Sequence, residues 1–145
     1  MGVRARERIW KGTYICEYLG EFIDIDEASL RLSNTSLTTD HNYLIVVREH
    51  FHPSIGNRVI SIDARNSGNI ARFINHSCDP NACMIIGHVG SDLPRVGLFA
   101  MRDIDANEEI CFDYGSPDSS LSSTVCHCNT ALCRNFLPED KNLYP

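Results

Sequence analysis

Three cysteines lie close together near the C-terminus, in the pattern Cys126-x-Cys128-x4-Cys133. The chain has seven cysteines, an odd number, and its N-terminus shows no secretory signal, so a disulfide framework is not expected. Closely spaced thiols that are not paired as disulfides are typical ligands of zinc. The tail therefore predicts a zinc site, with a reduced, metal-free tail as the alternative.

The predicted zinc site lacks one ligand, because a structural zinc ion takes four tetrahedral ligands and the tail supplies three. The candidates for the fourth position are Cys78, His127 and His76. His127 lies between two of the tail cysteines and would have to fold back, so it is the least favoured. The remaining cysteines lie in apolar runs, where we expect them to be buried as small hydrophobic side chains. They are Cys16, Cys83 and Cys111.

A dense polar turn is set in an apolar context at residues 72–81, which read Arg-Phe-Ile-Asn-His-Ser-Cys-Asp-Pro-Asn. One interpretation is purely structural: a helix ends with Asn75 as its cap and is followed by a turn that contains Pro80. The other interpretation is a functional turn whose polar groups bind a ligand. The run by itself favours neither interpretation.

A third run ends a predicted strand with Phe112, Asp113, Tyr114 and Gly115. A tyrosine at the end of a strand, followed by glycine, can direct its hydroxyl into a cleft. Taken by itself, Tyr114 is better explained as an ordinary aromatic side chain at a strand end.

Elements that position these runs are expected to form a mainly β fold with short helices, because the hydrophobic pattern gives many short strands between turns. Helical patterns cover residues 26–32, with Asp26 near the N-cap, and residues 68–74. The expected strands are 13–20, 43–47, 59–62, 82–86, 96–101 and 110–114, of which the second and third form a hairpin.

Composition limits the classes of function. The chain has 145 residues with a hydrophobic fraction of 43%, which fits one globular domain. Its net charge of −6 argues against a direct nucleic-acid partner and fits a basic peptide, and solubility alone explains the charge equally well. No apolar run approaches the roughly 20 residues that span a bilayer, so no membrane partner is expected.

Taken together and in this order, the three runs resemble the SET-domain lysine methyltransferases that carry a post-SET zinc segment. The likeness extends from Gly2 to about Leu137 and is greatest for the histone H3 enzymes of the pre-SET, SET and post-SET type. It implies small β-sheets around a knot-like crossing of the segments 75–78 and 112–114, plus a small zinc-binding tail. The implied division is a SET domain at 1–115, a flexible Gly/Ser/Pro-rich linker at 116–124 and a post-SET segment at 125–145.

The resemblance also implies roles for individual residues. Tyr114 matches the catalytic tyrosine, and Phe112 matches the substrate-channel position that tunes how many methyl groups are added. The positions that match cofactor contacts are Gly2, Tyr43, Arg72, Asn75 and His76, with Arg72 the weakest. The positions that match the zinc ligands are Cys78, Cys126, Cys128 and Cys133.

The activity that the resemblance implies is transfer of methyl groups from S-adenosylmethionine to a lysine, with the basic histone H3 tail as the expected partner. It implies a monomeric, chromatin-associated protein of the nucleus. The alternatives are a non-catalytic SET-fold module that holds peptides or partners, and a plain zinc-binding interaction domain.

Two features depart from the family pattern. The pre-SET region has no counterpart, and the N-terminal Gly-x-Gly loop keeps only Gly2. We therefore expect weak activity from this chain alone.

Overall fold

The structure is a computed structural model that describes residues 2–34, 43–50, 56–115 and 120–139. Within these ranges strands predominate, and helix is limited to one α-helix and one 3-10 helix. This confirms the expected mainly β fold with short helices. The chain divides into two compact units, one of Met1–Tyr18 with Phe73–Lys141 and one of Leu19–Arg72 with Asn142–Pro145. Neither helix of the described ranges is long and apolar enough to cross a membrane.

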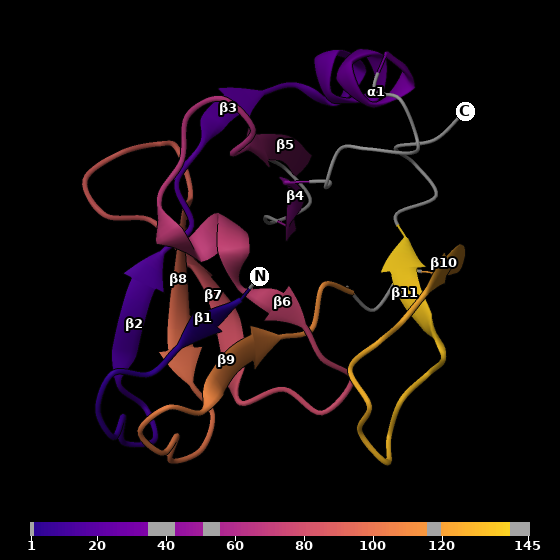
Figure 1. Ribbon diagram of the computed structural model, residues 1–145. Coiled ribbons are helices and arrows are strands. Elements are labelled where there is room, and N and C mark those ends of the chain that lie inside the picture. Colours follow the sequence, from indigo (N-terminus) through magenta and orange to yellow (C-terminus); the bar gives the residue numbers. More distant parts are fainter. Residues whose placement is uncertain (1, 35–42, 51–55, 116–119, 140–145) are drawn as a thin grey trace. The chain divides into compact units, whose positions relative to one another are not determined.

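An antiparallel sheet of the first unit has the strand order β2–β8–β7 (Figure 1). Along β8 the side chains alternate between core and surface, so Val96, Leu98 and Ala100 are buried. Burying a side chain of the size of valine or leucine stabilises a fold by about 1.5–3 kcal/mol, so β8 anchors this sheet. The strands are β2 (Tyr14–Glu17), β7 (Ala82–Gly87) and β8 (Arg95–Ala100).

A second sheet of the first unit has the order β1–β9–β6 and brings two distant runs of the sequence together. β1 (Val3–Arg4) pairs antiparallel with β9 (Glu109–Phe112), and β6 (Asn75–His76) pairs parallel with β9 on its other side. In the parallel pair, Asn75 lies opposite Cys111 and His76 opposite Phe112. The segments 75–78 and 112–114 therefore run side by side, as the resemblance implies.

The cysteine-bearing tail forms an antiparallel hairpin of β10 (Ser120–Val125) and β11 (Phe136–Glu139). The loop between these strands carries the three tail cysteines (yellow in Figure 1). Residues 120–124 of the predicted linker thus lie in a strand, because pairing with β11 satisfies backbone groups that composition alone leaves unassigned. Residues 116–119 lie outside the described residues, and the boundary between domain and tail stays a prediction.

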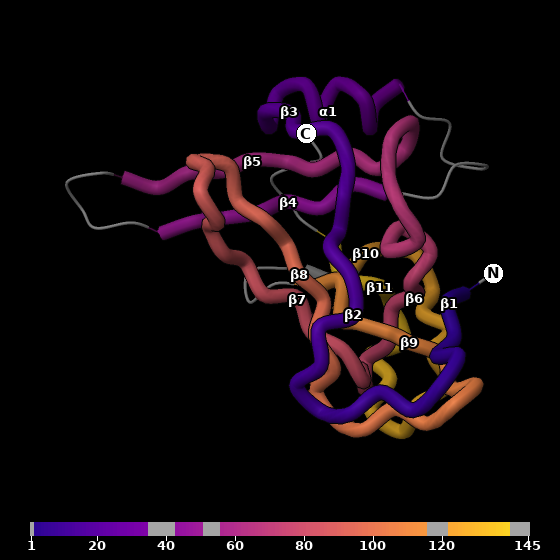
Figure 2. The backbone as a smooth tube through the Cα atoms, turned by 90° about the vertical axis from the view of Figure 1, so that its left-hand side faces the viewer, coloured from indigo at the N-terminus to yellow at the C-terminus, as the bar shows by residue number. Residues whose placement is uncertain are grey.

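The second unit consists of the sheet β3–β5–β4 and the helix α1 (Figure 2). The predicted hairpin is confirmed, since β4 and β5 pair antiparallel from Leu44 opposite Asp63 to His50 opposite Asn57. α1 buries Ala28 and Leu32 next to the apolar side chains of this sheet. The elements are β3 (Glu21–Ile23), α1 (Ile25–Ser33), β4 (Leu44–His50) and β5 (Asn57–Asp63).

Several local predictions need correction. The N-cap of α1 is Asp24 rather than Asp26, and its carboxylate accepts the Glu27 amide at 2.8 Å. The second predicted helix is the four-residue 3-10 helix η1 (Ile70–Phe73), because the polar turn at Asn75 enters a strand before an α-helix can propagate. The three cysteines expected to be buried, Cys16, Cys83 and Cys111, are only partly buried.

Candidate active site and metal centre

Four cysteine side chains converge where the loop of the β10–β11 hairpin meets Cys78, which lies two residues beyond the end of β6. Their sulfur atoms all lie within 4.8 Å of one another, and Cys78 Sγ is 3.8 Å from Cys126 Sγ. Zinc–sulfur bonds of about 2.3 Å in a tetrahedron place sulfur atoms about 3.8 Å apart, so the spacing fits zinc. The group consists of Cys78, Cys126, Cys128 and Cys133, and it leaves His76 and His127 outside the set.

The environment of the cysteine cluster also favours a cation. A hydrogen bond with the Thr130 hydroxyl lowers the pKa of Cys128 to about 5, which favours its thiolate. Burial raises the pKa of Cys126, so this thiol becomes a thiolate only if a positive charge compensates. Four sulfur donors close a tetrahedron without an open position, which is the arrangement of a structural site. The residues present therefore fit a structural zinc ion.

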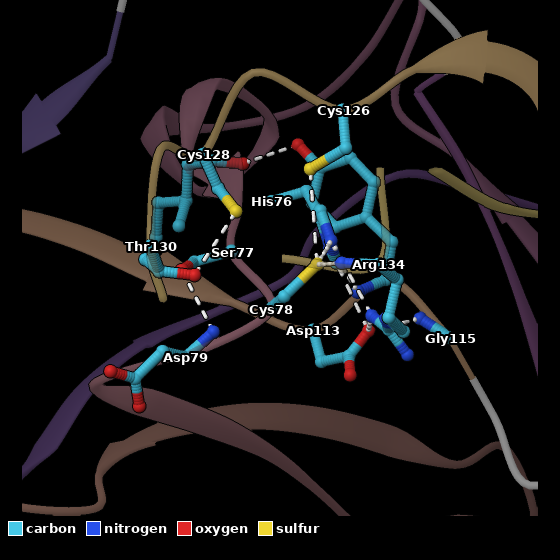
Figure 3. A network of polar contacts seen from close by, with 12 residues as sticks. His76, Ser77, Cys78, Asp79, Asp113, Gly115, Cys126, Cys128, Thr130 and Arg134 are labelled. Carbon is cyan, nitrogen blue, oxygen red and sulfur yellow. Dashed lines mark hydrogen bonds and ion pairs between the residues drawn. The ribbon is translucent and has the colours of Figure 1, made fainter. Parts of the chain in front are cut away.

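His76 connects this cluster to the end of β9 (Figure 3). Its ring is buried, and Nδ1 accepts the backbone N–H of Tyr114 at 3.1 Å. Its Nε2 lies 3.3 Å from Cys78 Sγ. Burial lowers the pKa of His76, so the neutral ring prevails near neutral pH, with its proton on Nε2 because Nδ1 is an acceptor. Both nitrogens of the imidazole are therefore engaged within the protein.

Tyr114 lies two residues beyond the end of β9 and is 43% exposed. Its hydroxyl donates to the carbonyl of Ile74 at 2.7 Å, which fixes the direction of the phenol proton. Its ring packs against Phe112, with centroids 4.8 Å apart, and against His76 at 5.3 Å. Phe112 itself is only 3% exposed. The two aromatic positions implied by the resemblance are therefore adjacent, one buried and one accessible.

Gly2 and Asn75, two of the positions that the resemblance assigns to the cofactor, lie close together beside β9. Asn75 Nδ2 donates to Glu109 Oε1 at 2.7 Å. A Cβ atom at Gly2 would lie 2.3 Å from Glu109 Oε1 and 2.8 Å from Asn75 Nδ2. Only a glycine lets the backbone pass this close without displacing the pair.

Tyr43 and Arg72 belong to the second unit. The Arg72 guanidinium lies over the Tyr43 ring at 4.4 Å from its centroid, a cation–π contact. The same guanidinium donates to the carbonyls of Ala64 and Arg65 at 2.9 and 3.0 Å. These contacts hold the Tyr43 ring in one orientation within this unit.

Part of the polar run at 72–81 serves the fold. The buried carboxamide of Asn81 donates to the Glu109 carbonyl at 2.8 Å and accepts the Cys111 amide at 2.9 Å, extending β9 at its edge. Sequence reasoning missed Glu109, Asp113 and Arg134, which contact the candidate residues Asn75, His76 and Cys78 in turn. In the sequence these three residues are marked only by their position inside or next to the three runs. Because charged residues are common at surface positions, that position alone does not predict a role for them.

Comparison with known proteins identifies the family. A sequence model of the SET domain matches residues 1–115, so the chain belongs to the SET-domain family. The probable histone-lysine N-methyltransferase set-23 of Caenorhabditis elegans is 40% identical over 140 residues, covering 94% of this chain and 55% of that protein. The histone-lysine N-methyltransferase SETMAR of Bos taurus is 36% identical over 158 residues, covering 99% and 50%. The chain spans about half the length of these relatives.

Solved structures agree with this assignment. The methyltransferase domain of human histone-lysine N-methyltransferase SETMAR superposes with a TM-score of 0.85 at 35% identity, covering 96% of this chain and 54% of that one. Arabidopsis thaliana SUVH6 in complex with SAM superposes with a TM-score of 0.72 at 32% identity, covering 93% and 30%. The expected SET fold is therefore confirmed.

Proposed function

We propose that this chain is the methyl-transfer module of a protein-lysine N-methyltransferase that uses S-adenosylmethionine. The observation that carries the proposal is the parallel pairing of β6 with β9, which brings the Asn75–His76 run beside the Phe112–Tyr114 run. Relatives and a structural neighbour named as histone-lysine N-methyltransferases support it, as does the likeness to SUVH6, which was solved in complex with SAM.

The methyl donor would bind first at the Gly2, Asn75 and Glu109 group. The close approach of Gly2 to the Asn75–Glu109 pair provides a backbone cradle with a carboxylate beside it. Negative charge at this place suits a ligand that carries a cationic ammonium and a cationic sulfonium. We assign Tyr43 and the His76 backbone as further contacts, with Arg72 acting by holding the Tyr43 ring. When bound, S-adenosylmethionine would supply an electrophilic methyl group on sulfur.

The chain's own side chains would prepare the lysine for attack. A free lysine has a pKa near 10.4 and must lose its proton before it can act as a nucleophile. The accessible ring of Tyr114, packed on the buried Phe112, would desolvate the amine, and desolvation disfavours its charged form. Because the Tyr114 proton is directed at the Ile74 carbonyl, the phenol oxygen meets an approaching amine as an acceptor. Tyr114 would thereby orient the amine, and alignment of amine, methyl and sulfur would supply much of the rate.

Zinc would act on structure and not on the reaction, because four cysteines complete its coordination. Cys78 lies two residues beyond the end of β6, so the ion would fix the tail hairpin to the strand that carries Asn75 and His76. This supports assignment of Cys78, Cys126, Cys128 and Cys133 as a post-SET zinc site.

The expected partner is a basic, lysine-containing protein tail. The chain carries a net charge of −6, which complements the charge of a histone tail. The relatives' names point to histones, and we propose histone H3 as the substrate and chromatin in the nucleus as the location.

The proposal is tested by incubating the chain with labelled S-adenosylmethionine and overlapping lysine-containing peptides of histone H3. We expect label to be transferred, and Tyr114→Phe to lower kcat about 100-fold with little change in the affinity for S-adenosylmethionine, because the hydroxyl acts mainly in the transition state. Equal rates for both proteins would remove Tyr114 from its role. Binding of S-adenosylmethionine without transfer to any peptide would favour the non-catalytic module.

A further inference from the structure

Arg134 joins the cysteine cluster to the turn that carries Tyr114 (Figure 3). It follows the cluster residue Cys133 in the chain, and its backbone N–H donates to Cys78 Sγ at 3.4 Å. Its side chain then reaches Asp113, with Nη2 donating to Oδ1 at 2.7 Å. One residue therefore contacts a cluster sulfur with its backbone and the Tyr114 turn with its side chain.

The Asp113 carboxylate organises the turn itself. The same Oδ1 that accepts from Arg134 also accepts the backbone N–H of Gly115 at 2.9 Å. Asp113 and Gly115 flank Tyr114, so this side-chain-to-backbone bond closes the turn around the tyrosine, a typical Asx turn. An ion pair with Arg134 restrains the rotation of the carboxylate, and hence the position of Oδ1.

A second connection reaches the same turn from the other side. The Tyr114 amide donates to His76 Nδ1, and the protonated Nε2 of that ring faces Cys78 Sγ at 3.3 Å. Arg134 Nη2 lies 3.4 Å from His76 Nε2, and because both nitrogens carry protons this is a packing contact rather than a hydrogen bond. The backbone around Tyr114 is thus held by Asp113 and His76, and both side chains contact Arg134.

We propose that Arg134 is a positioning residue for methyl transfer: its ion pair with Asp113 fixes the 113–115 turn and so sets the direction of the Tyr114 phenol. The inference rests on the proposed function. It explains how the folded tail acts on catalysis, since Arg134 is held in place by the cysteine cluster. Both partners are more than a third exposed, and such pairs contribute little to global stability. The effect of removing the pair is therefore expected in kcat rather than in unfolding.

The test compares Arg134→Gln, Arg134→Lys, Asp113→Asn and the double variant Arg134→Gln/Asp113→Asn in the full chain. We expect Arg134→Gln to lower kcat about tenfold, while KM for S-adenosylmethionine and the zinc content stay within about twofold, because only the direction of the phenol changes. Lysine should restore part of the rate, since it supplies the charge without the guanidinium geometry. Asparagine at position 113 keeps an acceptor for the Gly115 amide but cannot form the ion pair with Arg134. Adding Arg134→Gln to Asp113→Asn should therefore lower kcat by less than a further factor of about two.

Arg95→Gln is the matched control, because Arg95 forms a comparable ion pair with Glu17 on the β2–β8–β7 sheet. It should leave kcat unchanged. The proposal would be overturned by an unchanged kcat in Arg134→Gln. It would also be overturned if Arg134→Gln lost zinc in parallel with its rate, or if the two losses of rate added in the double variant.

A readout independent of activity separates this inference from the proposed function. If the parent chain transfers no methyl group, the proposed function fails by itself. The positioning contact is then judged from the NMR signals of the Tyr114 amide and ring in the zinc-loaded protein. Arg134→Gln must shift these signals and leave those of Tyr14, which packs against Phe99 in the other sheet, in place. Unshifted Tyr114 signals would overturn the assignment of Arg134.

Discussion

The carboxamide of Asn75 donates through Nδ2 to Glu109 Oε1 at 2.7 Å, and Gly2 passes so close to this pair that any side chain there would displace it. β1 and β6 lie on opposite sides of β9, which contributes Glu109, so all three residues are fixed by one small sheet. The geometry makes Gly2 a requirement for the Asn75–Glu109 contact.

Gly2→Ala should weaken the binding of S-adenosylmethionine about tenfold, which corresponds to about 1.4 kcal/mol. The added Cβ would meet Glu109 Oε1, the end of a flexible side chain, so Glu109 would swing away and its hydrogen bond with Asn75 would be lost. Calorimetric titration measures the change. Gly87→Ala is the matched control, because no heavy atom lies within 4 Å of the added Cβ there. Equal affinities of the two variants would contradict the assignment of Gly2 and Asn75.

Metal content tests the cysteine cluster. The purified, reduced chain should carry about one zinc ion, and Cys133→Ser should lose most of it and unfold the tail hairpin, because structural zinc contributes folding energy directly. Atomic absorption and hydrogen exchange of β10 and β11 measure both effects. Cys83→Ser removes a partly buried cysteine outside the cluster and should keep the zinc. A folded parent chain that contains no zinc would rule the site out.

The stability of the first unit should depend on pH through Glu108. A hydrogen bond from Arg102, helped by the Asp105 amide and Asn81, lowers the pKa of Glu108 from 4.5 to about 2. Because the folded pKa lies below the unfolded one, the ionised carboxylate stabilises the fold above about pH 4.5. That contribution is lost as the pH falls towards about 2.

Glu108→Gln should therefore flatten the acid side of the stability curve. Urea unfolding at pH 6 and at pH 3 measures the difference, and the parent chain should lose more unfolding free energy between these values than the variant. Glu7→Gln removes an exposed carboxylate and should leave the slope unchanged. Identical pH dependence of the parent chain and Glu108→Gln would refute the role of the Arg102 contact.

The sequence predicts the cysteine cluster better than it predicts the pairing of the β-strands near the cluster. Cysteine spacing is a local signal, so Cys126, Cys128 and Cys133 stand out without any structure. The β4–β5 hairpin is also predictable, because strand-forming runs at 43–47 and 59–62 flank a segment whose sequence is rich in turn residues, among them Gly56 and Asn57. Neither depends on contacts between distant parts of the chain.

Pairing between short, distant segments is not visible in the sequence. β1 and β6 have two residues each, too few for any periodicity, and they become strands only because β9 lies between them. Asp113 and Arg134 are 21 positions apart and gain their relationship from the same tertiary arrangement. The Ser-rich stretch before Val125 forms a strand for a similar reason, since β11 supplies its partners.

The number of methyl groups should depend on the phenylalanine that precedes Tyr114 by two residues. Phe112 is 3% exposed, and the centroid of its ring lies 4.8 Å from that of Tyr114. Because a phenylalanine has no hydroxyl, it cannot hold the amine or a water molecule beside the tyrosine by a hydrogen bond. We expect the active protein to add more than one methyl group, and Phe112→Tyr to slow the second transfer about tenfold, or about 1.4 kcal/mol in barrier. A tyrosine would fill space beside Tyr114 and hold the amine in one orientation, which hinders the turn that a methylated amine must make.

Mass spectrometry of the peptide, compared when both proteins have added the same amount of first methyl group, measures the mono-, di- and trimethyl products. Phe99→Tyr, in β8, adds the same hydroxyl in the other sheet of the unit and should leave the distribution unchanged. Equal trimethylation by the parent chain and Phe112→Tyr would show that Phe112 serves packing alone.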